Sequence, residues 1–136
     1  MTTSLADPFT LPCGLALPNR IAKAAMTEDL ADVRTNDPNA RHERLYRRWA
    51  RGGLGLQITG NVMVDRRYLE RTGNIVVDAK TDRAALARWA EACTEGGAKA
   101  LVQINHPGRQ CSVFVSRQPV APSPVKVDGR CTCVAV

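Results

Sequence analysis

A pattern of helix, double glycine and strand occurs twice in this chain, and it restricts the folds that the chain can adopt. The first copy runs from Ala40 to Thr59 and the second from Arg83 to Ile104. Both helices contain Arg-Trp-Ala, and both strands contain an apolar residue followed by Gln-Ile. Helices and strands that alternate at this length predict βα units and a parallel sheet. We therefore expect an α/β fold.

The residues before the first copy predict two further elements. Apolar runs at Phe9–Leu11 and Leu15–Leu17 lie on either side of Gly14, and this pattern predicts a β-hairpin. Ile21–Ala25 then predicts a first strand of small and apolar residues. The carboxyl end of this strand is followed by more polar residues.

Both helices carry terminal signals. Asn36 or Asp37 is predicted to cap the first helix, Ala40–Arg51, because short polar side chains satisfy the free amides of a first turn. Thr81-Asp82 is predicted to cap the second helix, Arg83–Glu95. A Gly-Gly pair is expected to end each helix.

Each helix also has a predicted apolar face. Leu45 and Trp49, four residues apart, form the stripe of the first helix, with Tyr46 beside it. The face of the second helix comprises four residues at positions i, i+3, i+4 and i+7, namely Leu86, Trp89, Ala90 and Cys93.

The remaining segments predict two more strands and an irregular connection. Leu54–Thr59 is predicted as a strand closed by Gly60-Asn61. The segment from Val62 to Val77 is charged and irregular, with a short extended run at each end. Ala98–Ile104 is a strand that is apolar on both sides, so three parallel strands leave open edges and an uncovered face. We expect marginal stability, and self-association through those edges.

Composition and charge exclude several classes of protein. The chain has 136 residues, 44% hydrophobic content and a net charge of +6. No apolar run approaches the ~20 residues of a membrane helix, and the first residues do not resemble a signal peptide. The arginines of Arg41–Arg51 are interpreted as a solvated face, because aromatic platforms for nucleic acid are missing beside them. Five cysteines and two histidines lack the spacing of a zinc site. Because a secretory signal is not expected, we predict reduced thiols and a cytoplasmic protein.

Polar or small residues follow all three predicted strands. If the strands are parallel neighbours, their carboxyl ends face one pocket. The side-chain amide of Gln103 offers a donor and an acceptor to an imide edge, and Thr27 offers a hydroxyl. Such a pocket suits a planar heterocycle, whereas a hydrolytic triad is not evident. Taken singly, Met26 could be a core residue, Gln103 a satisfied interior amide, and His106 a loop residue bonded by the following Pro-Gly turn.

Five stretches in order resemble the old yellow enzyme family, especially its bacterial and fungal NADH:flavin oxidoreductase branch. The resemblance covers roughly residues 9–125. The stretches are Leu17–Ile21 leading into Ala25–Thr27, Tyr46–Gly53, Thr59–Val62, Gln103–Arg109 and Ala121–Ser123.

The resemblance implies the first three βα units of a TIM (β/α)8 barrel, with an N-terminal hairpin over its bottom. The cofactor would be FMN, reduced by NADH or NADPH, and the substrate an α,β-unsaturated carbonyl compound. Ala25, Met26 and Thr27 would line the isoalloxazine ring, with Thr27 tuning its potential. Gly60 would pack near the ring, and Gln103 would bond its pyrimidine side.

The same resemblance implies what this chain lacks. The substrate-binding pair and the phosphate-binding groups would lie on strands beyond Val136, so His106 is not assigned a catalytic role. A complete barrel needs about 250 residues. Residues 1–125 are therefore interpreted as the N-terminal part of an FMN-binding barrel and 126–136 as an atypical tail. We expect a truncated product or a shifted reading frame, with a deliberately small domain as the alternative. For the function, the alternative is a catalytically inert remnant that does not bind FMN stably.

Overall fold

A four-stranded parallel sheet forms the centre of the computed structural model, which describes residues 2–125 and 133–135. Its longest strand is β4, which pairs in parallel with every other strand of the sheet. Because β6 runs along the length of β4, β3 and β5 share the opposite edge. The strands are β3 (Ala22–Lys23), β4 (Leu56–Met63), β5 (Ile75–Val76) and β6 (Lys99–Asn105).

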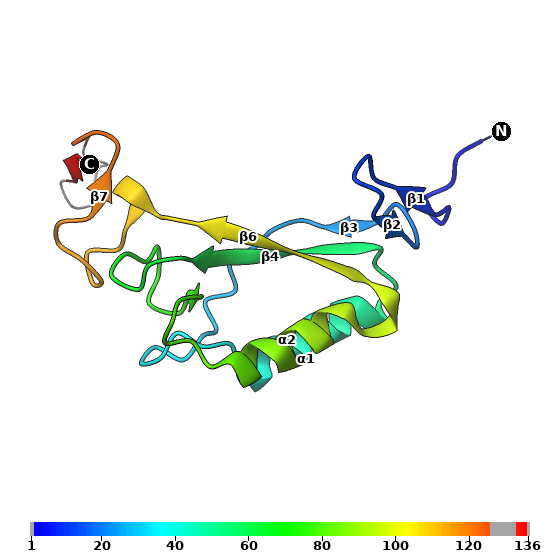
Figure 1. Cartoon of the computed structure of the whole chain (residues 1–136), viewed down its shortest axis with the longest axis horizontal. Helices are drawn as coiled ribbons and strands as arrows, with labels where there is room; N and C mark the ends of the chain where they lie inside the picture. The colour runs from blue at the N-terminus through cyan, green and yellow to red at the C-terminus, as the bar shows by residue number, and fades with distance from the viewer. Residues whose placement is uncertain (1, 126–132, 136) are drawn as a thin grey trace.

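Two helices cover one face of this sheet (Figure 1). They are α1 (Ala40–Arg51) and α2 (Arg83–Thr94), and each precedes a strand of the sheet. Gly53 and Gly96 have φ angles of 84° and 69°, a backbone conformation that glycine adopts readily, where the two helices give way to β4 and β6. The predicted α/β class and the repeated helix–Gly-Gly–strand unit are confirmed.

Short strand pairs lie at the two ends of the sheet (Figure 1). At the amino ends of the strands, β1 (Phe9–Thr10) and β2 (Ala16–Leu17) form the predicted antiparallel hairpin around Gly14. At the opposite end, β7 (Val120–Ala121) pairs in parallel with β8 (Val134–Ala135). Most of the segment predicted as an atypical tail, 126–132 and 136, lies outside the described residues.

The predicted end of the second sheet strand is wrong. β4 continues through Gly60 and Asn61 to Met63, because a β-bulge absorbs one extra residue there. Ile58 pairs with Leu101 and Asn61 pairs with Gln103, so two residues of β4 lie opposite one residue of β6. The bulge places Asn61 on the same sheet face as Ile58, which a regular strand would not do.

The predicted cap of α1 is also wrong. Asn39 is the capping residue, since its side chain accepts a hydrogen bond from the Arg41 amide. The Asn39 amide in turn donates to Nδ1 of His42 at 3.3 Å, which completes a capping box. Asn36 instead has a φ of 59° and binds the carbonyls of the segment before β5. Asp82 caps α2 as predicted.

The buried faces of the helices are rotated from the predicted ones. On α1 the buried residues are His42, Tyr46 and Ala50, and Leu45 is only half-buried. The Tyr46 ring packs edge-on against the ring of Trp89 on α2, with centroids 5.3 Å apart. On α2 the predicted Ala90 is exposed, whereas two unpredicted alanines are buried. The buried residues of α2 are Ala85, Trp89, Ala92 and Cys93.

The apolar surface expected on the third strand is confirmed. Leu101, Val102 and Ile104 of β6 are 54%, 48% and 72% exposed. Val102 and Ile104 line an apolar groove of about 440 Å³ together with Trp89 of α2. Self-association through this edge stays a prediction.

Buried His42 makes the stability of the fold depend on pH. Burial, with the charge of Arg41, lowers the pKa of His42 from 6.5 to about 4. The unfolded chain therefore binds more protons between these values, and stability falls as the pH drops from about 6.5 towards 4. His42→Gln keeps an acceptor for the Asn39 amide but does not titrate.

We expect the wild type to lose up to about 3 kcal/mol more than His42→Gln between pH 7.5 and 4.5. Urea unfolding at both pH values measures the difference, and the carboxylates common to both proteins cancel. An equal loss in the two proteins would contradict a buried neutral imidazole.

Candidate functional site

The chain that follows β3 lies directly against β4. A methyl group added at Gly60 would overlap the carbonyl oxygen of Met26 and lie 2.8 Å from Cα of Thr27. A glycine is therefore required for this close approach of two backbones. Gly60 and the Met26–Thr27 segment, which the sequence placed at two separate strand ends, are neighbours in the structure.

The side chain of Gln103 reaches the other side of the same strand. Its Nε2 donates to Oδ1 of Asn61, the residue that pairs with it in register across β4 and β6. Its backbone amide donates to Oγ1 of Thr59 at 3.0 Å. Asn61 in turn donates to Glu70 at 2.5 Å. β4 thus has Gln103 on one side and the Met26–Thr27 segment on the other. That the three strand ends face one pocket stays a prediction.

The exposure of these residues differs along the site. Met26 is 53% exposed, so it is not part of the core of the described chain. Ala25, Thr27 and Gln103 are half-buried, and Gly60 is buried. Among the described residues, none donates a hydrogen bond to Oε1 of Gln103, and none bonds the Thr27 hydroxyl. The site therefore offers one apolar surface, one hydroxyl and one amide acceptor.

His106 has the supporting role in the loop that the sequence indicated. Its Nδ1 accepts a hydrogen bond from the Gly108 amide at 3.2 Å, which closes the turn that follows β6. Its ring lies 5.4 Å from that of Tyr68.

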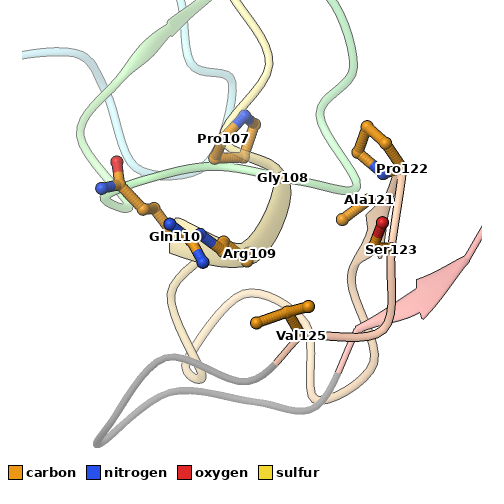
Figure 2. A pocket seen from close by; sticks show the side chains of 8 residues that line it. All are labelled: Pro107, Gly108, Arg109, Gln110, Ala121, Pro122, Ser123 and Val125. Atoms are coloured by element: carbon orange, nitrogen blue, oxygen red, sulfur yellow. The ribbon is translucent and has the colours of Figure 1, made fainter.

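A cavity of about 430 Å³ lies beyond the carboxyl end of β6 (Figure 2). It brings together the turn after β6 and the segment of β7, two stretches that carried the resemblance. A Cβ added at Gly108 of the turn would lie 3.9 Å from Cβ of Ala121. The lining residues are Pro107, Gly108, Arg109, Gln110, Ala121, Pro122, Ser123 and Val125.

Sequence reasoning missed two residues behind the site. The hydroxyl of Tyr46, on α1, donates to Oε1 of Glu28 at 2.5 Å and accepts from the Gly60 amide at 3.1 Å. Tyr46 is fully buried. Burial and the Glu28 carboxylate raise the pKa of Tyr46 far above its ordinary value, so the hydroxyl keeps its proton. The position of Glu28, directly after Thr27, was the available signal.

Known proteins are similar to this chain in sequence and in fold. An NADH-dependent flavin oxidoreductase of Hypocrea jecorina, iliE, is 46% identical over 110 residues, which are 78% of this chain and 27% of that protein. The structure of morphinone reductase covers 92% of this chain and 33% of its own, with 26% identity and a TM-score of 0.77. The chain matches an N-terminal part of the old yellow enzyme family.

The fold extends to more distant members of that family. The old yellow enzyme homologue from Zymomonas mobilis has a TM-score of 0.82 at 24% identity and covers 98% of this chain and 40% of its own. These relatives are TIM barrels, and the described residues form a four-stranded parallel sheet that does not close into a barrel. The chain thus spans about a quarter of the length of the curated relative. No family model matches it.

The described part of the chain contains neither a membrane-spanning helix nor a cluster of metal ligands. Its helices are too short or too polar to cross a membrane. Its His, Cys, Asp and Glu side chains form no cluster of three or more that could hold a metal ion.

The contact at Gly60 predicts the effect of a single methyl group. Gly60→Ala forces the Met26–Thr27 segment away from β4, and overpacking of this kind costs about 1–3 kcal/mol. We expect this loss in the free energy of unfolding, measured by urea titration. An unchanged free energy would contradict the close approach of the two backbones.

Proposed function

We propose that this chain supplies the first wall of the FMN site in an ene reductase. Such an enzyme takes hydride from NADH or NADPH and delivers it to the β-carbon of an α,β-unsaturated carbonyl compound. FMN supplies the hydride-transfer chemistry, and the protein supplies binding, orientation and electrostatics. The proposal is supported by the flavin oxidoreductase relatives and by the convergence of Met26–Thr27, Gly60 and Gln103 at one sheet region.

The chemistry of the available groups fits a flavin ring. Gln103 has an acceptor that no described residue uses, and the edge of an isoalloxazine pyrimidine carries a donor between two acceptors. We assign Gln103 to that edge. The half-exposed Met26 side chain offers apolar surface for a ring face, with Ala25 beside it in the chain.

Thr27 and Gly60 have different roles in this proposal. The Thr27 hydroxyl is assigned to the reactive edge of the ring, where a hydrogen-bond donor changes the flavin potential. Gly60 keeps the Met26–Thr27 segment close to β4, so its contribution is the shape of the wall. The roles proposed for Ala25, Met26, Thr27, Gly60 and Gln103 all concern the ring, and none concerns the phosphate.

This restriction to the ring gives a test with two ligands. Riboflavin has the same ring as FMN but no phosphate, so we expect the chain to bind both with equal dissociation constants. Quenching of flavin fluorescence on titration with the protein measures each constant. We expect Gln103→Ala to weaken both ligands about tenfold, as for one lost hydrogen bond to the ring.

The matched control is Gln118→Ala, which removes the same amide from an exposed position. We expect it to bind both flavins as the wild type does. If neither flavin binds the wild type, the alternative of a remnant that does not hold FMN is correct. If FMN binds much more tightly than riboflavin, contacts to the phosphate dominate and the assignment of a ring wall is wrong.

A further inference from the structure

We propose that Tyr46 and Glu28 are positioning residues that hold the Met26–Thr27 segment in place for a flavin. The inference rests on the function proposed above. Neither residue is required to touch the ring, because both act from the helix side through the Met26–Thr27 segment and Gly60.

The segment has little other support. The parallel pairing of β3 with β4 ends at Lys23 and Gln57. Within the described residues, the backbone of Met26, Thr27 and Glu28 makes no hydrogen bond. Because unpaired backbone of this kind is free to shift, a side-chain contact must fix its position.

Tyr46 provides that contact from α1. One hydroxyl group joins both partners: it donates to Oε1 of Glu28 at 2.5 Å, and it accepts from the Gly60 amide at 3.1 Å. The first bond fixes the residue next to Thr27, and the second fixes the backbone that Met26 and Thr27 contact. Tyr46 therefore sets the separation between the two parts of the wall.

The rest of the Tyr46 side chain makes the hydroxyl a fixed point. Its ring packs edge-on against Trp49 and Trp89, with centroids 5.0 Å and 5.3 Å away. The ring is fully buried, so the hydroxyl has no freedom to follow a displaced Glu28. The helix layer thus determines where the Met26–Thr27 segment lies.

Tyr46→Phe removes the hydroxyl and leaves the ring in place, so it separates positioning from packing. We expect amide hydrogen exchange at Gly60, followed by NMR, to rise about tenfold, as for one lost hydrogen bond. We expect riboflavin to bind about tenfold more weakly. Exchange within α2, at Trp89–Cys93, should stay unchanged, which shows that the core remains folded.

Two further comparisons distinguish positioning from general stability. Tyr68→Phe is the matched control, because Tyr68 lies outside this network, and it should leave Gly60 exchange and riboflavin binding unchanged. Glu28→Gln retains an acceptor for the Tyr46 hydroxyl and should behave as the wild type, whereas Glu28→Ala should behave as Tyr46→Phe.

The outcomes separate this inference from the proposed function. If the wild type binds no riboflavin, the proposed function fails, but faster Gly60 exchange in Tyr46→Phe and Glu28→Ala still supports the positioning network. If riboflavin binds the wild type and both variants equally, or if Gly60 exchange is unchanged in them, the positioning role is overturned.

Discussion

The close contact between Gly60 and the Met26–Thr27 backbone is the constraint on which the site depends. It requires a residue without a side chain on β4, because a methyl group there would overlap the Met26 carbonyl. The same part of β4 contains the bulge between Ile58 and Asn61, which shifts the pairing of β4 with β6 by one residue. The bulge and the glycine together place Asn61 beside Gln103 and the Met26–Thr27 segment beside β4.

The helix layer fixes this contact from behind. Tyr46 joins Gly60 to Glu28, and its ring is enclosed by two tryptophans of the same layer. Lys23 also lies there, with its ammonium 4.5 Å from the Trp49 ring, and burial lowers the pKa of Lys23. Polar groups thus lie between the sheet and the helices as well as at the proposed flavin wall, where Met26 is exposed and Thr27 and Gln103 are half-buried.

The outer side of the helix layer is charged, as expected from the interpretation of the arginines in Arg41–Arg51 as a solvated face. Arg47 and Arg51 of α1 both pair with Glu95, which follows α2, at 2.7 Å and 2.5 Å. Arg88 pairs with Glu43 at 3.2 Å. These pairs join the two helices at partly exposed positions, where each contributes at most about 1 kcal/mol. The aromatic contacts, rather than the ion pairs, therefore determine how α1 packs on α2.

Much of this arrangement could be predicted from the sequence, because periodicity and glycine pairs are local signals. The hairpin, both helices and the parallel sheet followed from them. The bulge could not be predicted, since Gly60-Asn61 has the local sequence of a strand end and only pairing with β6 keeps it in the sheet.

Non-local contacts explain the other errors as well. Asn36 has the side chain of a helix cap, but bonds to the carbonyls of Thr72 and Asn74 hold it elsewhere. The role of Tyr46 depends on Glu28, which lies 18 positions away along the chain. A helical stripe alone does not reveal such a partner.

The most direct test of the account is to locate a flavin ring on this chain. In an isotope-filtered NMR experiment with unlabelled riboflavin, we expect nuclear Overhauser contacts from the ring protons to the methyl groups of Met26 and Thr27. Contacts confined to Val102 and Ile104, in the apolar groove against α2, would contradict the account, because the flavin would then lie on the helix side of the sheet.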